Sequence, residues 1–112
     1  MQTGLQTLKA EFFRVLAHPI RIRLLERLVT GEQSVQDLQA ALALEQPIVS
    51  QHLAILRARG VVTVRREGVQ AHYSLASPLV ADVLRVSREF LNGHLSESRS
   101  MLRELRRESR RA

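Results

Sequence analysis

Cysteine is absent from this 112-residue sequence, and several other features are scarce. Without thiols the chain has no disulfide, no thiolate metal site and no thiol redox switch. Aromatic residues make up 4% and hydrophobic residues 45%, so we expect an aliphatic core. No apolar run approaches the roughly 18 residues of a membrane span, and the first residues lack the basic and apolar segments of a secretory signal. We therefore expect one domain over 1–112, located in the cytoplasm and independent of membranes.

Recognisable catalytic motifs are missing as well. The sequence has no glycine-rich phosphate loop and no HExxH pattern. Its histidines are scattered, with no acidic partner at motif spacing; they are His18, His52, His72 and His94. We expect a protein that is not an enzyme and needs no cofactor.

Negative charge is in the minority, since 17 Lys and Arg residues outnumber 11 Asp and Glu residues and give a net charge of +6. Only Lys9 is a lysine, so the positive charge is almost entirely arginine. This balance favours an anionic partner, nucleic acid first. Charge alone does not decide the matter, because many soluble basic proteins bind nothing acidic.

Residues 34–60 carry the pattern of a helix-turn-helix. Ser34 followed by Asp37 fits a capping box, with Asp in place of the usual Glu or Gln. Pro47 fits the first turn of a second helix, where a missing N–H costs nothing, and Gly60 fits a left-handed helix end. Apolar residues at helical spacing give each helix one inward face: Val35, Leu38 and Leu42, then Val49, Leu53 and Leu56.

The other face of the second helix has side chains that suit a major groove. It carries Gln46, Pro47, Ile48, Ser50, Gln51 and Ala54. Glutamine can bond an adenine edge through both ends of its amide, and small side chains let a helix enter the groove closely. We predict that Gln51 reads a base and that Ser50 contacts a phosphate or a base edge. The alternative is a merely solvated helix face.

Residues 61–76 change to a period of two, which predicts a β-hairpin. The apolar positions are Val62, Val64, Val69, Ala71, Tyr73 and Leu75. Arg65-Arg66-Glu67-Gly68 stands between the two strands. A lone hairpin is marginal in water, so it must pack on the helices. A helix-turn-helix followed by a basic hairpin is a winged helix, whose Arg65 and Arg66 would reach phosphates or the minor groove.

Two further side chains on the second helix each have two possible roles. His52 bonds either a phosphate or the helix-turn-helix backbone, and Arg57 is either a phosphate contact or part of a solvated helix end. The expected DNA-binding set is Gln46, Pro47, Ile48, Ser50, Gln51, His52, Arg57, Arg65, Arg66 and Gln70.

Both ends of the chain have more apolar surface than one small domain can bury. Helices are expected over 5–17 and 19–30, and a last helical pattern spans 78–108, where Asn92-Gly93 could kink or divide it. Pairing with a second copy would cover the excess. We predict dimerisation segments 1–17 and 78–108, with the interface residues Leu5, Leu8, Phe12, Leu84, Leu91, Leu95 and Leu102.

Four stretches together resemble the ArsR-type winged helix-turn-helix repressors. They are residues 16–25, similar to "LAHPxRxxIL", residues 49–56, similar to "VSxHLxxL", Gly60-Val61-Val62, similar to "GLV", and residues 65–75, similar to "RREGxxxxYxL". The resemblance implies a dimeric bacterial or archaeal transcription regulator with element order α-α-α-α-β-β-α. It also implies a dimer interface made by the first and last helices. Pro47 departs from the family, which often has Ser or Thr there.

Many members of that family sense metals, but the residues they use are largely absent here. One family site needs a cysteine cluster in the third helix, where this chain has Ser34 to Asp37. Another uses Asp-x-His and a later His-x-x-Glu. His94 and Glu97 match the second half, whereas Asp82 is one residue out of register. We predict no metal site, and Asp82, His94 and Glu97 remain weak candidates.

The sequence therefore predicts a mostly α protein with a small β-hairpin that binds double-stranded DNA as a homodimer. We expect it to be a sequence-specific transcriptional regulator, namely a repressor that binds an inverted-repeat operator. The alternatives are a metal-gated repressor of the same family and a winged-helix protein-interaction module. The sequence does not identify an effector.

Overall fold

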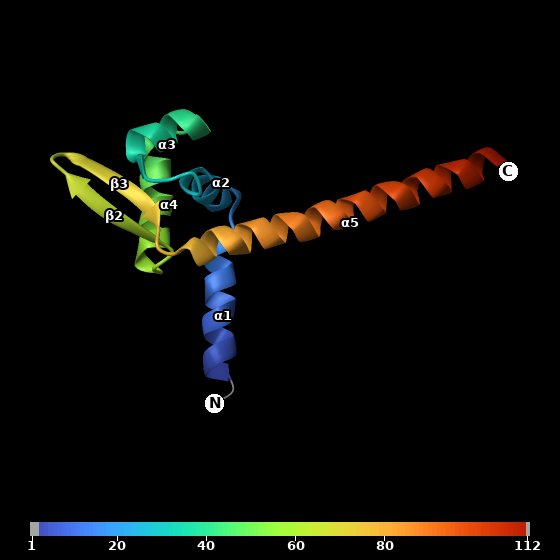
Figure 1. Ribbon diagram of the computed structural model, residues 1–112, viewed down its shortest axis with the longest axis horizontal. Helices are drawn as coiled ribbons and strands as arrows, with labels where there is room; N and C mark the ends of the chain where they lie inside the picture. Colours follow the sequence, from blue (N-terminus) through green and yellow to red (C-terminus); the bar gives the residue numbers. More distant parts are fainter. Residues whose placement is uncertain (1–2, 112) are drawn as a thin grey trace. The chain divides into compact units, whose positions relative to one another are not determined.

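A computed structural model describes residues 3–111. The chain forms two compact units, Met1–Ala81 and Asp82–Ala112. The elements, labelled in Figure 1 except for β1, are α1 (Thr3–Leu16), α2 (Pro19–Leu28), β1 (Gln33–Ser34), α3 (Val35–Leu42), α4 (Gln46–Ala58), β2 (Val62–Glu67), β3 (Gln70–Leu75) and α5 (Pro78–Arg111). The predicted order of four helices, a hairpin and a last helix is confirmed.

The core of the first unit is aliphatic, as expected. It lies among α2, α3 and α4, whose fully enclosed side chains are Leu24, Leu25, Leu38, Val49, Leu53 and Leu56. In α4 the buried positions follow the predicted spacing of four and then three residues. Because these three side chains point inward, the opposite face of α4 is directed to solvent.

Local sequence signals set the boundaries of the helix-turn-helix. The Ser34 hydroxyl accepts a bond from the Asp37 N–H at 3.1 Å, and the Asp37 carboxylate accepts one from the Ser34 N–H at 3.4 Å. This confirms the capping box. Gly60 has φ +74°, and the Val61 N–H bonds the Leu56 carbonyl, which is a Schellman helix end.

The turn between α3 and α4 depends on Ala43, a residue that the sequence pattern did not single out. Its φ of 55° is left-handed, and among residues 3–111 no other residue besides glycine has a positive φ. The Arg23 guanidinium donates to the Leu42 carbonyl at 3.0 Å, so α2 covers one of the free carbonyls at the end of α3. Ala43 and Arg23 thus mark the end of α3 and the turn that leads to α4.

The sheet differs from the expected hairpin in two ways. It has three antiparallel strands in the order β1-β3-β2, because the two-residue strand β1 pairs with β3. So short a strand has no detectable alternation of its own. Val69, predicted to continue the apolar alternation, lies instead in the two-residue loop Gly68-Val69 and is fully exposed. Gly68 has the positive φ that such a tight loop requires.

The first and last helices leave large apolar side chains in solvent. In α1, Val15 and Leu16 are buried, whereas Leu5 and Leu8 are 59% and 64% exposed. Residues 1 and 2 of the predicted segment 1–17 lie outside the described residues. In the second unit α5 continues through Asn92-Gly93 without interruption (Figure 1). No helix within residues 3–111 has the length and hydropathy to cross a membrane.

Candidate nucleic-acid interface

The outer face of α4 groups polar and small side chains on its first two turns. Gln46, Pro47, Ile48 and Gln51 are exposed and Ser50 is half-buried. The Gln46 side-chain amide donates to the Ser50 hydroxyl at 2.8 Å. That bond engages Gln46, whereas the Gln51 amide forms no hydrogen bond to any described residue. Gln51 is therefore the glutamine on this face with both ends of its amide available.

The beginning of α4 has no side-chain cap. Glu45 stands at the N-cap without a capping side-chain bond, and a proline follows within the first turn. The helix macrodipole places partial positive charge at this end. The N–H groups of Ile48 and Val49 both donate to the Glu45 carbonyl at 3.2 Å, and Pro47 has no N–H to offer. Pro47 stands where the ArsR-type repressors often have Ser or Thr, so this position lacks a hydroxyl. No neighbouring side chain among the described residues caps the helix in its place.

His52 points inward rather than toward the open face. It is half-buried, and its ring lies 4.4 Å from the ring of His18, centroid to centroid. His18 caps α2 by accepting a bond from the Ile20 N–H at 3.1 Å, so its role here is structural. Burial lowers the pKa of His52, and the nearby His18 and Arg21 act in the same direction. This environment favours a role in packing α4 on α2 over contact with phosphate.

Arg65 of the wing is bound by two carboxylates. Its guanidinium donates to both oxygens of Glu32, at 2.7 and 3.2 Å, and to Glu67 at 3.0 Å. These bonds raise the pKa of Arg65, and the same contact lowers the pKa of Glu32. The two-point geometry makes this a directed contact. Arg65 is a predicted DNA contact, and in this structure its side chain is joined to the loop before β1.

The sheet register explains how Glu32 meets Arg65. On β3, His72 lies between Ser34 of β1 and Arg65 of β2. Alternation puts Glu32 on the same face as Ser34, and Glu67 on the same face as Arg65. Strand alternation could have predicted the contact of Arg65 with Glu67. No sequence signal indicates Glu32, because the sheet brings it next to a residue 33 positions away.

The remaining predicted contacts are exposed and free. Arg57, Arg66 and Gln70 all lie in solvent. Within the described residues, the side chains of Arg57 and Arg66 form neither a hydrogen bond nor an ion pair. Arg66 follows Arg65 on β2 and therefore points to the other side of the strand. It is the wing arginine whose charge is not compensated locally.

The weak metal candidates lie apart in the second unit. Asp82 is 3.7 Å from the guanidinium of Arg85, and the His94 ring stacks on Phe90. His94 lies twelve positions after Asp82 on the helix, which is about 18 Å along the axis. Across residues 3–111 no group of three or more His, Cys, Asp or Glu side chains is placed to hold a metal ion.

A helix-turn-helix whose second helix exposes amides, followed by a basic antiparallel hairpin, defines a winged helix-turn-helix DNA-binding protein. A family model described as "Bacterial regulatory protein, arsR family" matches residues 18–64. An uncharacterised HTH-type transcriptional regulator of Mycobacterium tuberculosis, Rv0081, is 47% identical over 103 residues, covering 91% of this chain and 90% of that protein. The chain belongs to the ArsR family and is a DNA-binding transcriptional regulator.

Solved structures agree with this assignment. The crystal structure of M. tuberculosis Rv0081 matches with a TM-score of 0.78, covering 84% of this chain and 95% of that one. A homodimeric winged helix-turn-helix domain from Mycobacterium bovis also matches at 0.78, with 27% identity, covering 86% of this chain and 89% of that one. A probable mercury resistance operon repressor of Streptomyces lividans is 39% identical, covering 70% of this chain and 63% of that protein. These names describe regulators, and no enzymatic activity is among them.

Proposed function

We propose that this protein is a repressor that binds an inverted-repeat operator as a homodimer in the cytoplasm. The outer face of α4 carries the proposal, because its exposed amide and small side chains fit a major groove while its apolar face fixes the helix on the core. Two α4 helices would enter successive major grooves about 34–36 Å apart. The relative from Streptomyces lividans is named as a probable mercury resistance operon repressor, which supports repression rather than activation.

Exposed apolar side chains on α1 and α5 support the homodimer. In α1 they include Leu5 and Leu8, with Phe12 half-buried beside them. In α5, Leu91, Leu95 and Leu102 are each about half exposed and recur at helical spacing, and Leu84 is half-buried. Such rows are costly in water, and a symmetric partner can cover both. A solved relative, the winged helix-turn-helix domain from Mycobacterium bovis, is homodimeric.

The test is binding of the purified protein to the DNA that flanks its own gene, followed by footprinting. A sequence-selective complex that contains two chains and protects two half-sites about one helical turn apart is the expected result. Equal binding to random DNA at moderate salt would overturn the proposal. If the chain forms dimers but no sequence-selective complex with DNA, that result would instead favour a protein-interaction module. The exposed apolar row of α5 also suits such a module.

The two wing arginines are expected to differ in their effect on DNA binding. Arg66→Gln should reduce the slope of log affinity against log salt by about 0.9, which corresponds to one phosphate contact. Arg65→Gln should change that slope less, because Glu32 and Glu67 already neutralise Arg65. Affinity measured by fluorescence anisotropy over a salt series checks this prediction. The Glu32→Gln/Arg65→Gln double variant keeps the net charge and is the control; equal slope losses for Arg65→Gln and Arg66→Gln would contradict the distinction.

A further inference from the structure

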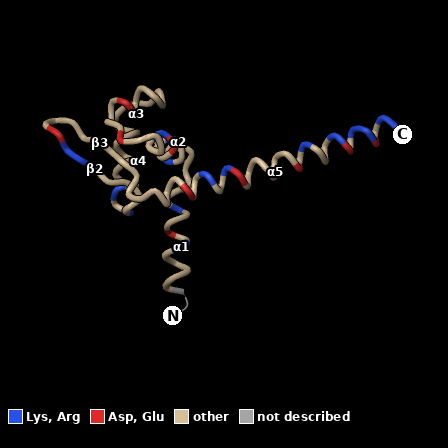
Figure 2. Tube along the Cα trace, in the orientation of Figure 1, with Lys and Arg blue, Asp and Glu red and all other residues tan. Residues whose placement is uncertain are grey.

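The last turns of α5, within the second unit, are rich in arginine (Figure 2). Residues 99–111 contain six arginines and two glutamates. At about 100° per residue, four of the arginines fall within an arc of about 60° on the helix surface. We call these four the arginine stripe; they are exposed, span about 16 Å along the axis, and are Arg99, Arg103, Arg106 and Arg110.

No carboxylate among the described residues neutralises the arginine stripe. Side chains three or four positions apart are neighbours on a helix surface. At these separations from the stripe arginines, the chain has only leucine, serine and further arginine. Arg99 with Arg103, and Arg106 with Arg110, are like charges four positions apart, which destabilise a helix in water. A polyanion beside the stripe would remove this repulsion.

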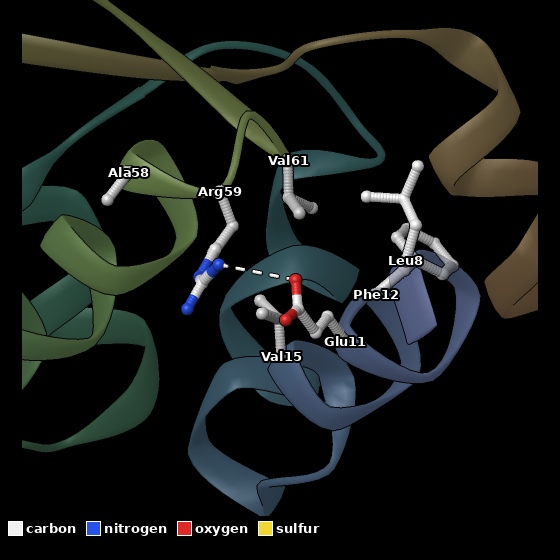
Figure 3. A pocket seen from close by; sticks show the side chains of 7 residues that line it. All are labelled: Leu8, Glu11, Phe12, Val15, Ala58, Arg59 and Val61. Carbon is white, nitrogen blue, oxygen red and sulfur yellow. Dashed lines mark ion pairs between the residues drawn. The ribbon is translucent and has the colours of Figure 1, made fainter. Parts of the chain in front are cut away.

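Other arginines of the chain have the acidic partners that the stripe lacks. On the same helix, the Arg85 guanidinium lies 3.7 Å from Asp82 and 3.2 Å from Glu89. In the first unit, the Arg59 guanidinium lies 3.6 Å from Glu11 (Figure 3). In the last turns of α5 the two signs are instead separated. The acidic residues there lie about 130–170° around the helix from the centre of the stripe, and they are Glu97, Glu104 and Glu108.

We propose that the arginine stripe is a second DNA-binding surface, which binds the phosphate backbone of duplex DNA without regard to base sequence. The chain is a DNA-binding regulator, so its polyanionic partner is duplex DNA. A guanidinium group matches two phosphate oxygens at once. Over about 16 Å, duplex DNA presents about nine phosphates, enough to meet every arginine of the stripe. Such contacts hold a protein on DNA but carry no sequence information.

The proposed pairing of α5 leaves the stripe accessible. In the last turns the exposed apolar residues are Met101, Leu102 and Leu105, whose common centre lies about 120° around the helix from that of the stripe. Arg103 and Arg110 lie about 100° and 80° from Leu102, and long arginine side chains extend their charged ends into water. An anionic membrane would need the apolar and basic faces free together. A partner chain on the apolar face therefore favours DNA over a membrane.

Fluorescence anisotropy of the full-length protein on a random DNA duplex, over a salt series, tests the stripe. Arg103→Gln/Arg110→Gln should lower the slope of log affinity against log salt by about 1.8 for each stripe in contact with DNA, since each lost phosphate contact counts about 0.9. The matched control, Arg107→Gln/Arg111→Gln, removes the same charge from the same turns, beside Glu104 and Glu108. Its slope should change much less, because those glutamates already offset the two arginines.

Three results would overturn the stripe: equal slope losses in the two variants, no loss in the stripe variant, or a stripe variant that no longer forms dimers in sedimentation equilibrium. Equal losses would show an effect of net charge alone. An unchanged slope with stripe-dependent binding to vesicles of phosphatidylserine and phosphatidylcholine would assign the surface to a membrane. The absence of any selective operator complex would count against the proposed function alone, because the random duplex is sufficient to measure the stripe.

Discussion

Introducing two carboxylates into the apolar row of α5, by Leu95→Glu and Leu102→Glu, is expected to lower operator affinity by about 10²- to 10⁴-fold. The leucines are 54% and 48% exposed, so the substitutions disturb no core within the chain. In a symmetric pair they would bury four charges at the interface, which are costly without partners. A single subunit binds only one half-site and loses the gain from linked sites, which accounts for the size of the effect.

Sedimentation equilibrium and DNA-binding isotherms measure the two parts of this result. The matched control is Gly93→Glu/Ser100→Glu, which adds the same charges about 140–180° around the helix at ~100° per residue. Both control positions are exposed, and a side chain at Gly93 would meet no described atom within 4 Å. Dimers that persist in the leucine variant, or equal losses in the control, would show that this row does not form the interface.

Gln51→Ala is expected to weaken operator binding by about 1–3 kcal/mol and to relax specificity at one base pair. The exposed amide of Gln51 is not engaged by another described residue, whereas Gln46 already donates to Ser50 at 2.8 Å. Gln51 can therefore make a two-point contact with a base without first breaking an internal bond. Removal of that contact affects the correct base more than the wrong ones.

Binding to the operator, to single-base operator variants and to random DNA separates base reading from backbone contact. Gln36→Ala is the matched control, because it removes an exposed amide from α3 instead of α4. The control should bind the operator as the parent protein does. If Gln51→Ala lost equal affinity for operator and random DNA, Gln51 would be a backbone contact and not a base reader.

Helix-forming signals in the sequence were sufficient to predict the helix-turn-helix. The capping box of Ser34 and Asp37 and the left-handed Gly60 depend on residues within a few positions of each other. The apolar spacing of Val49, Leu53 and Leu56 indicated which face of α4 is buried, and thereby which face is exposed. Such features can be predicted because backbone geometry fixes them over one or two turns.

Strand β1 and the contacts that depend on it were not predictable in the same way. Two residues are too few to display a period, and they become a strand only because β3 offers free hydrogen-bonding groups. That pairing brings Glu32 to Arg65, a predicted DNA contact that is already paired with carboxylates in this structure. A sequence indicates how many charges exist, but it does not indicate which are already paired.

The chain by itself thus determined the order of its elements, the inward and outward faces of its helices and its lack of thiol chemistry, because these follow from local geometry and composition. Tertiary structure alone decided that Arg65 is paired with two carboxylates while Arg66 has no partner among the described residues, and that His52 turns toward His18. Each of these depends on atoms that are distant in sequence and meet only after the helices and the sheet have packed. Their electrostatic consequences act over a few ångströms in space, regardless of separation along the chain.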